Sequence, residues 1–314
     1  MDLIAVDSNR RERFTLSGYS ADFANGDENS FSVETHLEEY PRFKDILFLS
    51  VDKTEFGGRI NNIFVDTDEK KLKFSGKTWR GMLEEKIIIP PDKKYYIGSG
   101  QPYMILSRIL SYTGLSSLFK VKYFEADDIS KYQFERYCTV LEGFTAFLKS
   151  INKCLTVNFD KGYVYLSAED LIENEIDNYD CHIEISKDIL PINHLICLGA
   201  GELENREVSH LYLQEDGTIG KTQFYTYLEE RTSVYDYPNC ESSSELEAGG
   251  IKRFEELLES ESSSFSLQEK EINIGQNVTT YEHITGTQLK KCVSKKILSL
   301  KNSKGEISYE VSDI

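Results

Sequence analysis

The stretch that decides the fold is Asn62–Pro91, NIFVDTDEKKLKFSGKTWRGMLEEKIIIPP. Apolar and polar side chains alternate on both sides of Asp66–Glu69, which predicts a β-hairpin over residues 62–76. Thr78 can then cap a helix, and Pro90-Pro91 would end it because proline cannot continue the helical hydrogen bonds. The residues predicted to share the apolar face of this helix are Trp79, Met82, Leu83 and Ile87.

The rest of residues 1–92 reads as strands. Ser30–His36 alternates apolar and polar residues, which predicts one buried face. Ile46–Asp52 is more continuously apolar and predicts a buried strand. We therefore expect a β-domain at residues 1–92 that ends in a helix.

Residues 93–191 change character. Pro102 and Gly114 bracket one predicted helix, and the apolar spacing of Val140–Lys153 predicts another. Leu155–Ala168 is a predicted hairpin that turns at Asp160-Lys161-Gly162. Helices followed by a hairpin favour a small α+β unit inserted into a β-protein.

The chain returns to strands after this insertion. Residues 192–264 predict strands followed by a helix over about Ser244–Glu259, whose outer face is acidic. Residues 265–314 predict a C-terminal β-domain with a hairpin that turns at Asn302–Gly305. The expected fold class is therefore mainly β with an α+β insertion.

The composition of the 314 residues suits a folded chain, with 39% hydrophobic and 28% charged residues. Its aromatic content of 12% adds weight to β-structure. No signal peptide or 18-residue apolar run is apparent, so we expect no membrane anchor. Six scattered cysteines without a Cys-x-x-Cys pair predict free thiols in a reducing cytosol.

The formal net charge is −17, which offers no basic footprint for nucleic acid or for an anionic membrane surface. We therefore expect no direct, sequence-specific binding of nucleic acid. The acidity has two interpretations: a surface to which DNA does not adhere, or solubility alone.

A Gly-x-Gly occurs in His194–Arg206, HLICLGAGELENR. A dinucleotide fingerprint needs a third glycine at the start of a helix, where the helix dipole meets pyrophosphate. Glu204 occupies that position, and the following VSHLYLQ predicts a strand. We therefore expect no nucleotide cofactor and two glycines that serve packing. We also expect Glu202 and Arg206 to pair, either along the chain or across a subunit boundary.

Metal and nucleophile patterns are equally weak. The only close Cys/His pairs are Cys181-His182 and His194-x-x-Cys197, whereas structural zinc needs four converging ligands. The other three histidines, at positions 36, 210 and 283, are isolated in the sequence. No HExxH, EF-hand or Gly-x-Ser-x-Gly pattern occurs. We expect no metal, cofactor or catalytic residue, although 53 acidic residues leave a glycosidase-type carboxylate pair open as an alternative.

Three short motifs resemble signatures of tail-hub (baseplate hub) proteins of tailed bacteriophages and phage-tail-like bacteriocins. The first is Phe74–Leu83, FSGKTWRGML, with Ile87–Pro91 after it. The second is Leu198–Glu202, LGAGE, with Arg206. The third is Ile274–Val278, where Gln276 and Asn277 depart from the usual Gly-Asp-x-Val. The signature residues are Gly76, Trp79, Arg80, Gly199, Gly201, Glu202, Arg206 and Gly275.

The resemblance implies two domains that resemble the β-barrels of tail-tube proteins, decorated with smaller α+β domains. It implies a trimeric ring that joins the sixfold tail tube to a threefold spike or fibre, in contact with tape-measure and other baseplate proteins. Residues 1–92 would be the first barrel-like hub domain, 192–264 would complete the hub, and 265–314 would be the C-terminal β-domain. The chain would assemble in the bacterial cytoplasm and then reside in the virion or tail-like particle, without a catalytic role. The sequence does not decide between a contractile and a noncontractile tail, or between a phage and a bacteriocin particle.

The sequence leaves two rival functions open. A tail-tip hydrolase of peptidoglycan or polysaccharide would need a carboxylate pair in a cleft. A carbohydrate-binding module would need an exposed row of aromatic side chains, for which the 19 tyrosines and 17 phenylalanines supply candidates.

Overall fold

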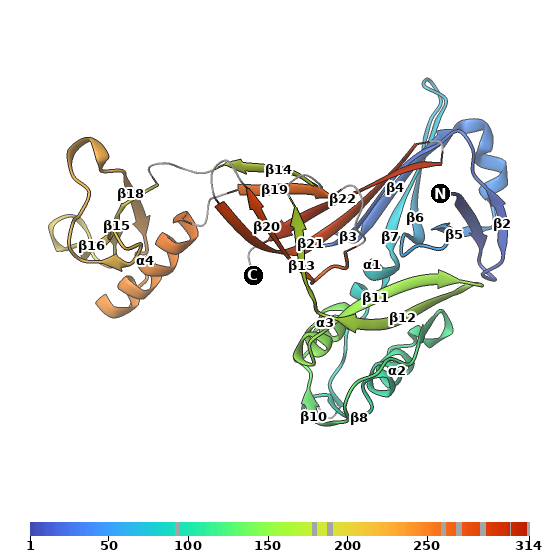
Figure 1. Cartoon of the computed structure of the whole chain (residues 1–314), viewed down its shortest axis with the longest axis horizontal. Helices are drawn as coiled ribbons and strands as arrows, with labels where there is room; N and C mark the ends of the chain where they lie inside the picture. Colours follow the sequence, from blue (N-terminus) through green and yellow to red (C-terminus); the bar gives the residue numbers. More distant parts are fainter. Residues whose placement is uncertain are drawn as a thin grey trace. The chain divides into compact units, whose positions relative to one another are not determined.

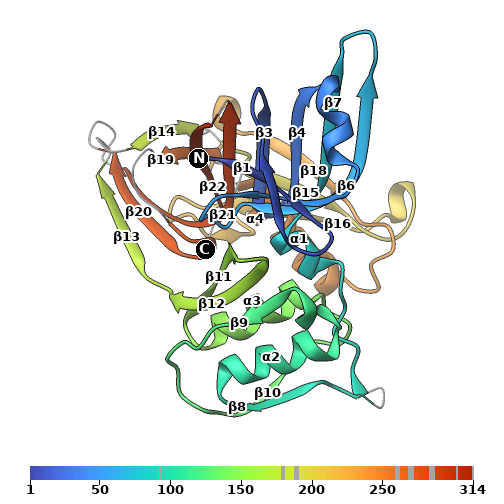
Figure 2. The same ribbon diagram turned by 90° about the vertical axis from the view of Figure 1, so that its right-hand side faces the viewer.

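The computed structural model describes residues 1–91, 94–177, 181–186, 191–258, 262–267, 272–282, 287–301 and 303–312. The chain divides into two compact units. Unit 1 comprises Met1–Ile183 and Phe265–Ile314, and unit 2 comprises Glu184–Ser264. The two units are described separately below (Figures 1 and 2).

Unit 1 is built on an 11-stranded sheet with strand order β13-β20-β21-β3-β4-β7-β6-β5-β1-β2, to which β22 is added beside β21. Its strands are β1 (Leu3–Asp7), β2 (Glu12–Thr15), β3 (Ser20–Gly26), β4 (Ser30–His36), β5 (Ile46–Val51), β6 (Gly57–Asp66), β7 (Lys71–Thr78), β13 (Glu173–Asp177), β20 (Asn277–Glu282), β21 (Thr287–Lys301) and β22 (Lys304–Ser312). The 3-10 helix η1 (Leu37–Phe43) follows β4. All pairings are antiparallel except that of β13 with β20. Over the described residues this order is a path with two ends, so no closed barrel is seen there.

Two of the apolar cores of unit 1 are built mainly from the strands of the large sheet. Strand β4 alternates as its sequence predicts, with Phe31 and Val33 buried beneath the sheet. They belong to a larger core with Leu298 of β21, whereas Val293 of the same strand belongs to a smaller core with Val278. The 15-residue strand β21 therefore contributes side chains to both cores. It joins the β-region around the larger core and the β-region around the smaller core into one continuous sheet.

The insertion follows β7. Its helices are α1 (Trp79–Glu84), α2 (Pro102–Tyr112), η3 (Leu115–Ser117) and α3 (Val140–Ser150). Its strands are β8 (Ile97–Gly100), β9 (Phe119–Val121), β10 (Ile129–Gln133), β11 (Lys153–Asp160) and β12 (Tyr163–Asp170), in the sheets β10-β8 and β11-β12-β9. Thr139 caps α3 in a reciprocal capping box with Glu142. The predicted α+β character of this region is confirmed.

The prediction for α1 was only partly right. Thr78 caps the helix as expected, accepting a hydrogen bond from the Gly81 N–H. The helix ends at Glu84, before Pro90, and Ile87 is 40% exposed rather than part of the apolar face. The cause is tertiary, because the backbone on both sides of Ile87 bonds to the segment that leads into α3: Ile88 N donates to Cys138 O, and Val140 N, at the first residue of α3, donates to Lys86 O.

Unit 2 is a four-stranded sheet with a helix packed against one face. The strand order is β17-β16-β15-β18, and helix α4 (Ser243–Leu258) packs against β15 and β16. The strands are β15 (His194–Leu198), β16 (Val208–Leu213), β17 (Ile219–Gly220) and β18 (Thr232–Asp236), with 3-10 turns η4 (Leu203–Asn205) and η5 (Tyr227–Glu229). Its core includes Leu195, Leu211, Leu246 and Phe254. The chain passes between the units within the paired strands β14 (Cys181–Ser186) and β19 (Ser262–Leu267).

This division differs from the four segments expected from the sequence. The insertion is not separate, because its core includes Val6 and Phe48 of the large sheet. Residues 265–314 also join that sheet, through β20, β21 and β22. Residues 192–264 have an apolar core of their own and lie within unit 2. No described helix is both long and apolar enough to cross a membrane.

Candidate functional site

The signature residues expected from the sequence occupy three places and are not brought together in one site. Gly76, Trp79 and Arg80 lie where β7 meets α1. Residues 199–206 follow β15 in unit 2. Gly275 precedes β20 in unit 1.

Trp79 is fully buried at the base of the insertion. Its ring stacks on Phe159 of β11, with centroids 5.1 Å apart and planes 9° apart. Phe48 of β5 lies 5.8 Å away by the same measure. Such stacked aromatic pairs add to the free energy gained from burying their area, so Trp79 joins the insertion to the large sheet.

Arg80 extends this junction with buried charge. It is 5% exposed, its Nη2 donates to Leu155 O at 2.7 Å, and its Nε lies 3.8 Å from Glu55 Oε2. The other Glu55 oxygen lies 2.7 Å from the Nζ of Lys296, which is 2% exposed. Burial lowers the pKa of the Arg80 guanidinium, and the Glu55 carboxylate opposes that effect. One carboxylate thus holds two buried cations, and the group links β11, the β5–β6 loop, α1 and β21.

Gly76 lies opposite a bulge in β6. A Cβ atom there would lie 1.9 Å from the Arg59 carbonyl oxygen, a distance that no side chain could occupy. The bulge falls between Ile60 and Asn62, where the β6–β7 register shifts. Gly76 therefore permits the close approach of these two strands.

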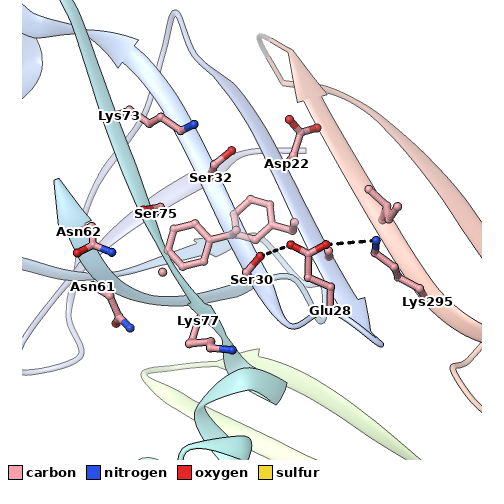
Figure 3. A pocket seen from close by; sticks show the side chains of 15 residues that line it. Asp22, Glu28, Ser30, Ser32, Asn61, Asn62, Lys73, Ser75, Lys77 and Lys295 are labelled. Atoms are coloured by element: carbon pink, nitrogen blue, oxygen red, sulfur yellow. Dashed lines mark hydrogen bonds and ion pairs between the residues drawn. The ribbon is translucent and has the colours of Figure 1, made fainter. Parts of the chain in front are cut away.

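A groove of about 550 Å³ lies on the face of the sheet formed by β3, β4, β6, β7 and β21 (Figure 3). We call it the trough. Its floor carries short side chains in register: Asp22 is opposite Ser32, which is opposite Ser75, which is opposite Asn62. The longer side chains along it include Glu28, Lys73, Lys77 and Lys295.

Most charges in the trough are paired. Glu28 accepts a hydrogen bond from Ser30 Oγ at 2.7 Å and lies 3.2 Å from Lys295 Nζ. The Ser30 hydrogen bond, followed by Lys295, lowers the pKa of the Glu28 carboxyl below its ordinary value. A glycosidase acid needs a raised pKa, so this environment does not suit Glu28 to that role. Asp22 accepts from Ser299 Oγ at 2.7 Å, and Lys77 pairs with Glu84 at 3.3 Å.

Lys73 differs from these groups. Among the described residues its ammonium forms neither a hydrogen bond nor an ion pair, and it is exposed. The Lys73 ammonium lies in the trough with the hydroxyls of Ser32 and Ser75 and the side-chain amide of Asn62 (Figure 3). Each of these groups can donate a hydrogen bond, and none donates one to another described residue. The trough can therefore hold carboxylate or carbonyl oxygens supplied from outside.

The Gly-x-Gly loop of unit 2 is a tight turn. Gly201 has a φ of +97°, and a Cβ atom there would lie 2.4 Å from Asn205 O. Gly199 packs beneath α4, since its Cβ atom would lie 2.8 Å from Leu246 Cδ2. Only the three-residue η4 follows, and then strand β16, so the predicted strand–loop–strand is confirmed.

Of the two arrangements expected for Glu202 and Arg206, the pairing along the chain is not found, and the pairing across a subunit boundary stays a prediction. Arg206 instead pairs through Nη2 with Asp236 of β18, and its Nε donates to Gly199 O at 3.3 Å. Glu202 is exposed at the turn. Arg206 therefore fastens the loop to the neighbouring edge strand.

Gly275 and Gln276 form a third structural turn. Gly275 has a φ of +92°, and its N–H donates to Val293 O at 2.8 Å. Gln276 is 4% exposed, and its amide donates to Asp170 O at 3.3 Å and accepts from Asn273 N at 3.2 Å. The residue that departs from the family pattern thus ties this turn to the end of the insertion.

Sequence reasoning missed one polar cluster, in unit 2. His194 is 7% exposed, with Nδ1 lying 2.6 Å from Glu230 Oε1 and Nε2 lying 2.8 Å from His210 Nδ1. Its ring stacks on Tyr212 at 4.4 Å. These residues are far apart in the sequence, and only the sheet brings them together. In the described part of the chain no group of three or more His, Cys, Asp or Glu could hold a metal, while the side chains of Cys181, His182 and His283 lie outside that part.

No protein-family model matches the chain, and no curated protein matches it. Among solved structures it is similar to the tail protein from Neisseria meningitidis MC58, at 12% identity and TM-score 0.48, over 99% of this chain and 96% of that one. It is similar to the prophage MuSo2 43 kDa tail protein from Shewanella oneidensis, at 12% identity and TM-score 0.49, over 100% and 98% of the two chains. It is also similar to prophage tail protein gp18 from Listeria monocytogenes EGD-e, at 12% identity and TM-score 0.49, over 99% and 94%. The resemblance to phage tail proteins that the sequence predicts is confirmed as a structural similarity at low sequence identity.

Proposed function

We propose that this chain is a structural hub of a phage tail or phage-tail-like particle. The observation that carries the proposal is the place of the first signature. Trp79 is fully buried, and Arg80 donates to the Leu155 carbonyl and forms an ion pair with Glu55. Trp79 and Arg80 of the motif that resembles the hub signature thus build the scaffold instead of lining a cleft, which suits a structural role better than a catalytic one.

In this proposal the two β-regions that share β21 correspond to two domains like those of the tail tube. Three chains would then present six such regions, which would join a sixfold tube to a threefold spike or fibre. Neighbouring copies would cover the sheet edges, and each contact would be heterologous and would close by rotation. The net charge of −17 would keep DNA from adhering to the ring.

The proposed partners are two further copies of the chain, the tail-tube protein, the spike or fibre protein, and tape-measure and other baseplate proteins. The chain would assemble in the bacterial cytoplasm and then remain in the particle. The proposal assigns it no catalytic role, no cofactor and no metal. It applies to contractile and noncontractile tails and to bacteriocin particles alike.

The test is the mass of the purified chain by light scattering, with negative-stain imaging of the same sample. The proposal expects a threefold ring of three 36.1 kDa chains, about 108 kDa. A chain that stays monomeric at every concentration would contradict the trimer. Wall-lytic activity that disappears in Glu28→Gln would contradict the noncatalytic role.

A further inference from the structure

The hairpin of β6 and β7 extends beyond the rest of the large sheet (Figures 1 and 2). We call residues 61–70 the arm. Strand β5 pairs with β6 only through Gly57–Arg59, so no described strand pairs with the outer edge of β6 from Ile60 to Asp66. That edge contains neither proline nor lysine, the residues that commonly protect an edge strand from pairing with another chain.

The arm is also apolar on both faces. Ile63, Phe64 and Val65 are 48%, 60% and 42% exposed. Phe64 is opposite Lys73 and so lies on the trough face of the hairpin, whereas Ile63 and Val65 lie on the other face. Three consecutive exposed apolar residues beside an open edge mark an interaction surface.

The arm cannot fill the trough of its own molecule. Ser75 and Lys73 of the trough belong to β7, and Asn62 belongs to β6, so the same two strands form both the trough and the base of the arm. A hairpin cannot fold onto the face of its own strands. An arm that occupies a trough must therefore occupy the trough of another copy.

The charges of arm and trough are complementary. The arm carries Asp66, Asp68 and Glu69 against Lys70, a formal charge of −2. The trough carries three lysines and two carboxylates, a formal charge of +1 in a chain of −17. Asp66 caps the turn of the hairpin, and Glu69 pairs with Lys71 at 2.7 Å. The Asp68 carboxylate in the arm and the Lys73 ammonium in the trough form no such contact among the described residues.

We propose that the arm of one copy lies in the trough of the next copy, with Phe64 covered and Asp68 near the neighbour's Lys73. The proposal rests on the ring assembly proposed above and names its contact. Apart from Asn61 and Asn62, which belong to both, arm and trough are formed by different residues of unit 1, so the contact is heterologous and can close into a ring. The short side chains of the trough floor, Ser32 and Ser75, leave room for a strand to approach closely.

The first experiment removes the apolar contact. Phe64→Ser should turn the ring into monomers in light scattering at a concentration where the wild-type chain is assembled. Tyr123→Ser is the matched control, because Tyr123 is an exposed aromatic at 68% that lies outside the arm and the trough. Both side chains are exposed, so circular dichroism should show unchanged folds. A ring that persists in Phe64→Ser would overturn the proposal.

The second experiment exchanges charges. Asp68→Lys and Lys73→Glu should each weaken assembly roughly fivefold, since each places like charges together at an exposed contact. The double variant should recover most of the wild-type assembly. Lys44→Glu, at an exposed lysine that forms no ion pair among the described residues, should have no effect. Additive losses in the double variant would contradict the pairing of arm and trough.

The third experiment separates this contact from a symmetric one. Ser32→Trp blocks the trough and leaves the arm intact, and Phe64→Ser does the reverse. A mixture of the two variants should form pairs of about 72 kDa, twice 36.1 kDa, and no ring. A mixture that stays monomeric would overturn the proposal.

The outcomes distinguish this inference from the proposed function. A wild-type ring that survives Phe64→Ser and Ser32→Trp leaves the hub proposal standing and removes the arm contact. A wild-type chain that is monomeric at all concentrations contradicts both proposals.

Discussion

Glu55 is the residue on which the buried charges of unit 1 depend. Its two carboxylate oxygens lie 3.8 Å from Arg80 Nε and 2.7 Å from Lys296 Nζ, and the side chains of both cations are almost fully buried. Without this carboxylate, two buried cations would lie close together with no opposite charge, which would strongly destabilise the folded protein. The stability of the junction therefore depends more on Glu55 than on either cation.

We expect Glu55→Gln to lower the free energy of unfolding of unit 1 by about 3 kcal/mol, the low end for removing one partner of a buried pair. Glu85→Gln is the matched control. Glu85 pairs with Arg59 at 2.7 Å, but both side chains are about one-third exposed, so its loss should cost less than about 1 kcal/mol. Denaturant unfolding measures both values. Equal losses in the two variants would show that burial does not set the strength of these pairs.

At the scale of elements, the turn after β15 depends on a conformation that only glycine adopts easily. Gly201 combines a φ of +97° with backbone atoms close to where a Cβ would be. Gly217 has a φ of +82° but no atom within 4 Å of that position. The two glycines thus separate the effect of backbone strain from that of close contact.

Gly217→Ala should destabilise unit 2 by about 1 kcal/mol, the strain of a left-handed alanine. Gly201→Ala should cost more, because the Asn205 carbonyl must also move, and η4 with it. The thermal transition of unit 2 and hydrogen exchange of the β15 and β16 amides measure the difference. A smaller effect at Gly201 than at Gly217 would refute this account of the turn.

Elements whose signals are local could be predicted from the sequence. The alternation of Ser30–His36, the hairpin of β11 and β12, the capping of α1 and the apolar spacing of α3 all lie within a few residues of the side chains that cause them. The early end of α1 could not be predicted, because it depends on bonds to Cys138 and Val140. Arg80 was a predicted signature residue, yet its partner Glu55 and the second cation on that carboxylate, Lys296, are distant in the sequence, so the charge network could not be predicted.

At the scale of the whole molecule, unit 2 has what a small domain needs to fold alone. Its sheet, its helix and the core around Leu195, Leu211 and Phe254 all come from one continuous segment. We expect residues 184–264, expressed alone, to unfold in one cooperative thermal transition with dispersed amide resonances. A broad, non-cooperative melt would show that this core requires unit 1.

Unit 1 is different, because its first and last segments are neighbours in one sheet. Strand β3 pairs along its length with β21, and the hydrogen bond from Ser299 to Asp22 spans 277 residues. A ribosome adding roughly 5–20 residues per second needs tens of seconds to bridge that interval. During this time β3 has one edge without its native partner, while the insertion and unit 2 have already been synthesised. The large sheet is therefore completed only after translation of the last strands, and chaperones that shield open sheet edges should bind the nascent chain until then.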